Sequence, residues 1–163
     1  EFKPLYGYTL TEKALSYLRI DKDYLVDFVG KILAKKFSVD RNVSMQGKSG
    51  VKHAFDIIAS DGERTALIDI AFSKDDVADP AILASYAKVF DTGIRDYTLI
   101  IWPKLQPSAQ SLATLYKINI IDASTLDALE DKVKGSLSSE GSVQPTELKS
   151  LNHVVASKQE ASR

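Results

Sequence analysis

The amino-acid sequence predicts one α/β domain built on a central mixed sheet flanked by helices. Two runs of alternating apolar and polar residues surround a turn within 52–72, a pattern typical of a β-hairpin. Apolar residues recur at helical spacing over 21–37. A β-branched run at 97–102 precedes a helical pattern and a short Ile-rich run at 118–121, which predicts parallel strands. At 163 residues, the chain is long enough for one such core and too short for two ordinary domains.

The first two predicted elements are a helix over 21–37 and a strand over 37–46. Val39 and Val43 are expected on the inner face of the strand, and lysines fall on the side of the helix opposite its apolar stripe. The apolar stripe of the helix consists of Tyr24, Leu25, Phe28, Val29, Ile32 and Leu33.

The predicted hairpin consists of strands at 52–59 and 65–72, joined by a turn at 60–63. The turn contains Asp61 and Gly62, a pair that tolerates positive φ and closes hairpins at low cost. The expected faces are Ala54, Asp56 and Ile58 against His53, Phe55 and Ile57 on the first strand, and Leu67, Asp69 and Ala71 against Ala66, Ile68, Ile70 and Phe72 on the second. The alternation therefore predicts that Asp56 and Asp69 are neighbours.

Two neighbouring carboxylates repel each other unless a cation lies between them. Mg²⁺ binds one or two carboxylates together with water and phosphate oxygens, an arrangement suited to phosphodiester chemistry. Asp56 and Asp69 are therefore candidate metal ligands. The alternative is that both are solvent-facing or strand-end residues.

Two helices and two strands are expected after the hairpin. Asp79 is a predicted N-cap with Pro80 at the first helical position, and this helix should end near Gly93. The strand at 97–102 shows no alternation and should be buried on both faces, ending at Pro103. The later expected elements are a helix from Pro107 through Leu112, Leu115 and Tyr116, a strand at 118–121, and a helix capped by Ser124 that contains Leu126, Leu129 and Val133.

Several classes of function and location are disfavoured by composition. The chain has no cysteine and only two histidines, His53 and His153, which argues against thiol chemistry, zinc clusters and a Ser-His-Asp triad. It has no phosphate-binding GxxxxGK[ST] or GxGxxG motif. It contains no run of eighteen apolar residues and no signal-peptide pattern, so we expect a cytoplasmic protein without a membrane span.

Positive charge is concentrated in one part of the chain, although the formal net charge is −1. Between 31 and 52 there are six basic residues and one acidic residue, Asp40, a local excess of 6 − 1 = +5. Such a stretch predicts contacts to DNA phosphates, and the alternative is the solvated basic face of an amphipathic helix. The predicted DNA-binding residues are Lys31, Lys35, Lys36, Arg41, Lys48 and Lys52.

The central stretch also carries a family resemblance. The glycine-flanked turn 47–50 leads to Asp56 on one strand, and Asp69 begins an acidic-spacer pattern with Ile70 on the next. This arrangement resembles the restriction-endonuclease-like PD-(D/E)xK nucleases, most closely their Mrr-like branch. The order of the later elements is similar too, so the resemblance spans 21–134. It implies a restriction-endonuclease-like core and a Mg²⁺ site in which Asp56 and Asp69 are catalytic.

The sequence departs from the family pattern at Ala71, where the family has a lysine. Loss of such a preorganised charge can cost on the order of 10²- to 10³-fold in rate. Lys74, just beyond the strand, is a candidate relocated catalytic lysine, and Lys48 and Lys52 are further candidates.

Both ends of the chain are set apart from the predicted core. The segment YGYTLTEKALSYL resembles the last wing strand and closing helix of a winged-helix DNA-binding domain, so residues 1–20 are interpreted as the end of such a domain. Residues 135–163 predict a polar tail with one short helix at 147–155, which would pack on a partner subunit of a homodimer.

Three functions are compatible with these features. The first is a DNA-binding domain on a nuclease-like fold whose catalytic site is degraded or divergent. The second is an active Mg²⁺-dependent DNA endonuclease with a relocated lysine. The third is a dimerisation or interaction module of a regulator.

Overall fold

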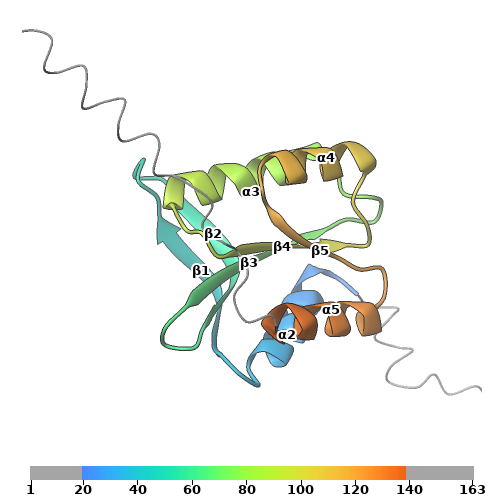
Figure 1. The fold of residues 1–163 in the computed structure, drawn as a ribbon, viewed down its shortest axis with the longest axis horizontal. Helices are drawn as coiled ribbons and strands as arrows, with labels where there is room; N and C mark the ends of the chain where they lie inside the picture. The colour runs from blue at the N-terminus through green and yellow to red at the C-terminus, as the bar shows by residue number, and fades with distance from the viewer. Residues whose placement is uncertain (1–19, 139–163) are drawn as a thin grey trace, which may run out of the picture.

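The computed structural model describes residues 20–138, which form five strands and four helices (Figure 1). The strands are β1 (Ser38–Gln46), β2 (Lys52–Ser60), β3 (Thr65–Phe72), β4 (Tyr97–Trp102) and β5 (Asn119–Asp122). The helices are α2 (Lys22–Leu33), α3 (Asp79–Thr92), α4 (Pro107–Leu115) and α5 (Leu126–Ser138). The predicted 1–20 segment, apart from Ile20, and the tail beyond Ser138 lie outside the described residues.

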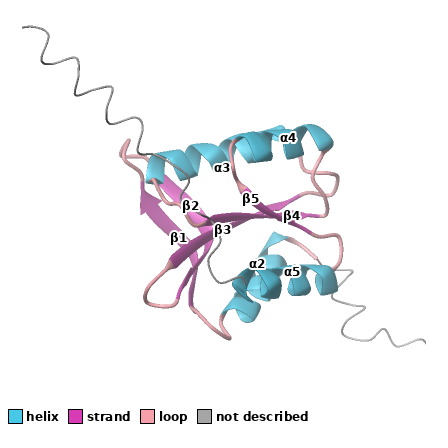
Figure 2. Ribbon diagram, in the orientation of Figure 1, coloured by secondary structure: helices cyan, strands magenta, loops and turns pink. Residues whose placement is uncertain are grey.

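The strands form one mixed sheet in the order β1-β2-β3-β4-β5. Strands β1, β2 and β3 pair antiparallel, whereas β3, β4 and β5 pair parallel. The helices α2 and α5 cover one face of the sheet, and α3 and α4 cover the other (Figure 2). The predicted fold class, an α/β core with a central mixed sheet flanked by helices, is confirmed.

Each face of the sheet has its own apolar core. Strand β4 is buried on both faces, as its run of β-branched and aromatic residues without alternation predicted. One core joins Leu25, Val29 and Leu129 to Ile57, Ile68 and Ile100, and the other joins Ile82, Ala109 and Ala113 to Leu67, Leu99 and Ile101.

Local signals set most helix ends, with two corrections. Gly93 ends α3 in the left-handed region (φ 70°), as expected. Asp79, predicted to cap this helix, is instead its first residue, and its carboxylate accepts a hydrogen bond from Ser108 Oγ (2.8 Å). At the start of α5, Thr125 Oγ1 rather than Ser124 accepts the backbone hydrogen bond, from Ala128 N (3.3 Å). The N-cap of α3 is therefore Ala78, which makes no side-chain capping bond, whereas the cap of α5 lies one residue later than predicted.

The predicted faces of β2 are wrong at one point. Phe55 packs in the core beneath α3 and α4, whereas Ile57 packs in the core beneath α2 and α5, although alternation placed them together. The change of face occurs at Asp56. Opposite it, Asn42 of β1 has a left-handed φ of 52°, and no β1–β2 pair forms between Arg41↔Ile57 and Val43↔Phe55. A strict two-residue period cannot anticipate such a local break in the pleat.

Candidate functional site

Asp56 and Asp69 lie side by side where β2 and β3 stop pairing. The last ladder pair is Ile57↔Ile68, so the two aspartates occupy the next opposed positions. Asp56 N donates to Asp69 Oδ1 (3.0 Å), and Ile70 N donates to Asp56 Oδ2 (2.7 Å). The side chains thus take over as acceptors for backbone N–H groups that no longer have a partner carbonyl.

Asp69 is the more enclosed carboxylate, with its side chain 9% exposed. Its Oδ2 accepts from Lys88 Nζ (2.7 Å), which extends inward from α3, and from Tyr97 Oη (3.0 Å) on β4. Burial, with the adjacent Asp69 carboxylate, raises the pKa of the Tyr97 hydroxyl above its ordinary value. Tyr97 therefore stays protonated, and its oxygen lies 2.9 Å from Ser85 Oγ.

Lys88 is held in place by more than one contact. Its Nζ also donates to Ala54 O (2.6 Å), and it lies 5.3 Å from the centroid of the Phe55 ring, within cation–π range. Lys88 therefore ties α3 to both strands of the hairpin.

Asp56 is neutralised from the other face of the sheet. Its Oδ1 lies 2.9 Å from Lys22 Nζ, at the start of α2, and its side chain is 14% exposed against 48% for Lys22. Helix α2 begins here because Asp21 Oδ1 accepts from Tyr24 N (2.8 Å). Lys22 and Lys88 thus approach the aspartate pair from helices on opposite faces of the sheet.

The fit to Mg²⁺ is poor in this arrangement. Each of the four carboxylate oxygens of Asp56 and Asp69 already has a protein partner, and two lysines balance the two negative charges. Within residues 20–138, no third His, Cys, Asp or Glu joins them in a group able to hold a metal ion. An ion would have to displace Lys22 and Lys88 from the carboxylates.

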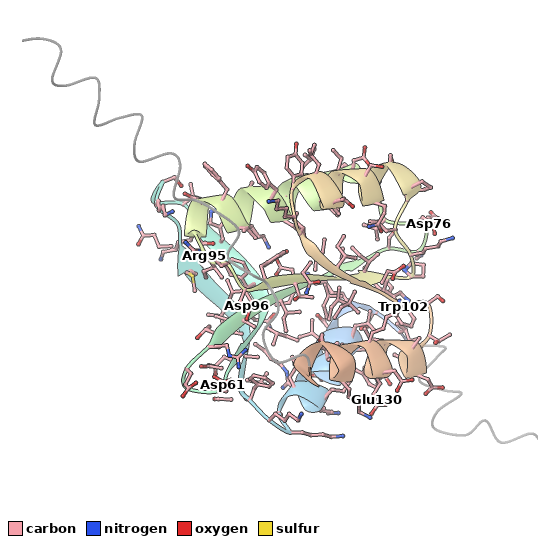
Figure 3. All side chains as sticks on the ribbon, viewed as in Figure 1. Asp61, Asp76, Arg95, Asp96, Trp102 and Glu130 are labelled. Carbon is pink, nitrogen blue, oxygen red and sulfur yellow. The ribbon has the colours of Figure 1, made fainter. Side chains whose placement is uncertain are left out.

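Lys74, the predicted relocated lysine, is not part of this cluster. It lies exposed in the β3–α3 connection, and among the described contacts it has no ion pair with either aspartate. Ala71, where the family lysine would stand, lines an open groove of about 420 Å³ at the carboxyl end of β3. Lys22 lines the same groove, as does Asp76, which Figure 3 shows at the Trp102 end of the sheet.

The predicted DNA-binding residues form two separate groups, all exposed. Lys31, Lys35, Lys36 and Arg41 surround the end of α2 and the first half of β1, and Arg41 is 3.5 Å from Asp27. Lys48 and Lys52 lie at the opposite end of β1, in and after the turn to β2. The nine-residue length of β1 separates the groups by roughly 25 Å.

The 47–51 turn is fastened to the C-terminal end of α3 by Asp91. Its carboxylate accepts from Ser49 N (2.8 Å) and Ser49 Oγ (2.6 Å) and lies 2.7 Å from His53 Nε2. Hydrogen bonds from Ser49 and His53 lower the pKa of Asp91 to about 2. Ser49 contacts Asp91 rather than the imidazole, so the three residues do not have the order of a Ser-His-Asp triad.

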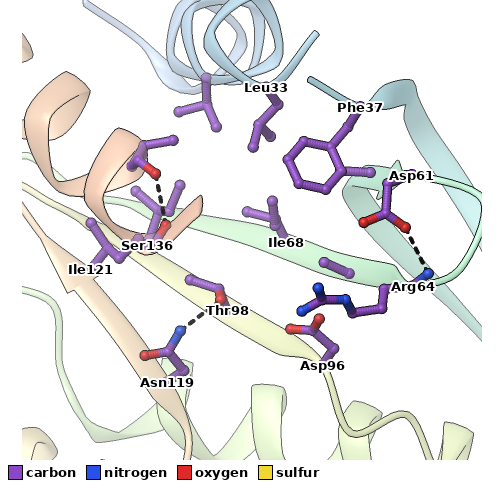
Figure 4. Close-up of a pocket in the computed structure, with 15 residues that line it drawn as sticks. Leu33, Phe37, Asp61, Arg64, Ile68, Asp96, Thr98, Asn119, Ile121 and Ser136 are labelled. Atoms are coloured by element: carbon purple, nitrogen blue, oxygen red, sulfur yellow. Dashed lines mark hydrogen bonds between the residues drawn. The ribbon is translucent and has the colours of Figure 1, made fainter. Parts of the chain in front are cut away.

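A more enclosed cavity than the groove beside Ala71 lies away from the aspartates. It has a volume of about 200 Å³ and an apolar wall between α2, α5 and the sheet, including Leu33, Phe37 and Ile68 (Figure 4). Arg64 and Asp96 lie at its polar margin. Neither Asp56 nor Asp69 lines it, so it is separate from the candidate site.

Sequence reasoning missed Lys22, Lys88 and Tyr97. Lys88 did carry a signal, because it is the only basic residue of α3 and lies three residues after Ser85, on the same helical face as buried Ile82. A lone lysine on an apolar helical face needs a buried partner. Lys22 carried no comparable signal, since it stands among charged residues at a helix start.

No family model matches this sequence, and the comparison with curated proteins gave no significant match. The fold is similar to the crystal structure of AF1548, a protein of unknown function, with a TM-score of 0.56 and 16% identity over 82% of this chain and 76% of that one. It is also similar to Can2 from Sulfobacillus thermosulfidooxidans, solved in complex with cyclic tetra-adenylate, with a TM-score of 0.55 and 13% identity. That likeness covers 77% of this chain but 38% of Can2. At these identities the similarity concerns the fold alone, and an Mrr-like affiliation remains a prediction.

No helix among residues 20–138 has the length and apolar character needed to cross a membrane.

Proposed function

We propose that this chain is a DNA-binding domain on a nuclease-like fold whose acidic pair is structural rather than catalytic. The observation that carries the second part is the pairing of each aspartate with its own lysine, Asp56 with Lys22 and Asp69 with Lys88. A catalytic pair would present free carboxylate oxygens to an ion and a phosphate. Here the oxygens hold two strands and two helices together.

The arrangement of basic residues favours DNA contacts along β1. This strand is the sheet edge, and its flanking basic groups lie roughly 25 Å apart, a span of about seven base pairs at 3.4 Å each. One duplex lying along the edge would meet Lys35 and Lys36 near one end and Lys48 near the other. Such contacts are to phosphates, so they bind without reading sequence.

The groove beside Ala71 is a poorer site for phosphate. Lys22 lines it, but Asp76 does too, and Asp75 lies next to it in the same connection. The charged residues around the groove therefore give it no excess of positive charge to bind phosphate.

Fluorescence anisotropy with labelled duplexes of unrelated sequence tests the proposal. We expect weak binding at low salt, similar for all sequences, that falls steeply as salt rises because counterions are released. If no binding is detected even at the lowest salt concentration, DNA binding is rejected and the interaction-module function is favoured.

A second candidate function is an active endonuclease in which Lys88 takes the role of the missing lysine. The observation in its favour is the 2.7 Å contact of Lys88 Nζ with Asp69, beside Asp56. This function requires the two lysines to leave the carboxylates when metal and DNA arrive. Cleavage of plasmid DNA with Mg²⁺ or Mn²⁺, abolished by Lys88→Ala but unaffected by Lys74→Ala, would establish it and overturn the structural interpretation of the pair.

A further inference from the structure

The outer face of α3 and α4 is an exposed apolar surface. Leu83 is 46% exposed, Tyr86 37%, Phe90 72% and Leu115 70%. Tyr86 links the two helices, because its ring stacks on Tyr116 at 4.3 Å between centroids and lies 6.0 Å from that of Phe90. We call Leu83, Tyr86, Phe90, Leu115 and Tyr116 the α3/α4 patch.

The charged residues of these helices leave the patch uncharged. Helix α3 has three, and all are engaged within the chain: Asp79 with Ser108, Lys88 with Asp69, and Asp91 with Ser49. Helix α4 has no charged residue. The outer surface of this layer therefore consists of apolar and neutral side chains.

The helices on the other face of the sheet, α2 and α5, differ because they expose many charged residues. Four charged residues of α2, namely Lys22, Asp23, Asp27 and Lys31, are exposed. Helix α5 likewise exposes Asp127, Asp131, Lys132 and Lys134. An ordinary solvent-facing helix carries such charges, and the α3/α4 layer does not.

The extent of the patch matches the centre of a protein interface. The exposed parts of its side chains amount to roughly 400 Å² of apolar surface, the size of the largest apolar patch on a typical soluble domain, which is often functional. A standard interface buries about 800 Å² on each partner, with an apolar centre and a polar rim. Thr114, a neutral polar residue beside the patch, is exposed and available for the rim.

We infer that the α3/α4 patch is the interface of a homodimer, covered by the same patch of a second copy of this chain. A two-fold interface apposes a surface to itself, so every charge on it meets a like charge near the axis. An uncharged surface avoids that repulsion between two copies of this chain. A different partner protein with a charged surface would find no complementary charge on it. The prearranged stack of Tyr86 and Tyr116 also reduces the entropy lost on binding.

Sedimentation equilibrium of the full 163-residue chain tests this inference, over protein concentrations up to on the order of 100 µM. We expect the wild-type chain to reach twice the mass of one chain. Phe90→Glu should weaken dimerisation at least tenfold, because it places two like charges in the interface. Leu115→Lys, on the other helix, should do the same and serves if the first variant does not fold by circular dichroism.

Val51→Glu is the matched control. Val51 is also an exposed apolar residue, at 55%, but it lies in the β1–β2 turn outside the patch, so its variant should dimerise like the wild type. A wild-type chain that stays monomeric throughout the range overturns the inference. So does a folded Phe90→Glu variant that dimerises as tightly as the wild type.

Discussion

Asp56 and Asp69 are joined through the backbone of their own hairpin: Asp56 N donates to Asp69 Oδ1 at 3.0 Å, one residue beyond the last β2–β3 ladder pair. The complementary bond runs from Ile70 N to Asp56 Oδ2. Two carboxylates that repel each other are thus kept adjacent by N–H donors and by Lys22 and Lys88. This arrangement accounts for a conspicuous acidic pair without requiring a metal ion.

Asp69→Asn should destabilise the domain. It removes the counter-charge of Lys88, whose side chain is 28% exposed, and leaves that ammonium facing a neutral amide. Loss of one partner of a fully buried pair costs about 3–5 kcal/mol, so with this partial exposure we expect about 2 kcal/mol. Urea unfolding measures the change. Asp75→Asn, at an exposed position, is the control and should stay within about 0.5 kcal/mol of wild type.

Tyr97→Phe should lower the free energy of unfolding by about 1–2 kcal/mol. The hydroxyl lies between Ser85 Oγ and Asp69 Oδ2, so its loss leaves Ser85 without this buried partner. Tyr24→Phe is the matched control, because within residues 20–138 the Tyr24 hydroxyl has no hydrogen bond and its ring stacks on Phe28. Equal effects of the two variants in chemical denaturation would contradict a role for the Tyr97 hydroxyl.

Asp91 should make stability depend on pH in the acid range. Its pKa is lowered to about 2 in the folded chain, below its ordinary value of 3.8. The stabilisation is therefore fully present above about pH 4 and is lost as the pH falls toward 2, when Asp91 is protonated and its bonds with Ser49 and His53 weaken. The unfolding free energies of wild type and Asp91→Asn should converge as pH falls across this window. A difference that stays constant from pH 5 to pH 2 would assign it to something other than this carboxylate.

Charge reversal at Lys35, Lys36 and Lys48 should weaken DNA binding for all sequences alike. Each lost phosphate contact should reduce the slope of log K against log salt by about 0.9. Anisotropy titrations at several salt concentrations measure the slope. Lys104→Glu, at an exposed lysine away from β1, is the control for net charge and should leave the slope nearly unchanged.

Ala71→Lys should raise cleavage above background if the missing lysine is what limits the site. Ala71 lines the groove at the end of β3, so a longer side chain has space to extend there. In that case the gain would be on the order of 10²-fold with Mg²⁺, with little change in DNA affinity, whereas the structural role proposed for Asp56 and Asp69 predicts cleavage at background. Failure of the variant to cleave would show that the lysine-bound aspartates, and not the absent lysine, prevent catalysis.

Metal binding can be followed separately by calorimetry, where the wild-type chain should give little heat at millimolar Mg²⁺.

The helices and strands and their order could be predicted from the amino-acid sequence. Local periodicity predicts the hairpin at 52–72 and the strand at 97–102 that is buried on both faces. The helix-ending preference of glycine predicts the end of α3 at Gly93. The adjacency of Asp56 and Asp69 also followed, because the turn at Gly62 fixes the register of the two strands.

The side chains around the two aspartates could not be predicted from the sequence, because they come together only when the chain folds. Lys22 and Lys88 are 34 and 19 residues from their partners in the chain and reach them from opposite faces of the sheet, which no periodic pattern encodes. The change of face at Asp56 arises from a break in strand pairing opposite Asn42, and it too is invisible to a two-residue period. The tertiary structure also decides where the basic residues lie. The six basic residues of 31–52 form two groups, because the extended strand β1 separates them.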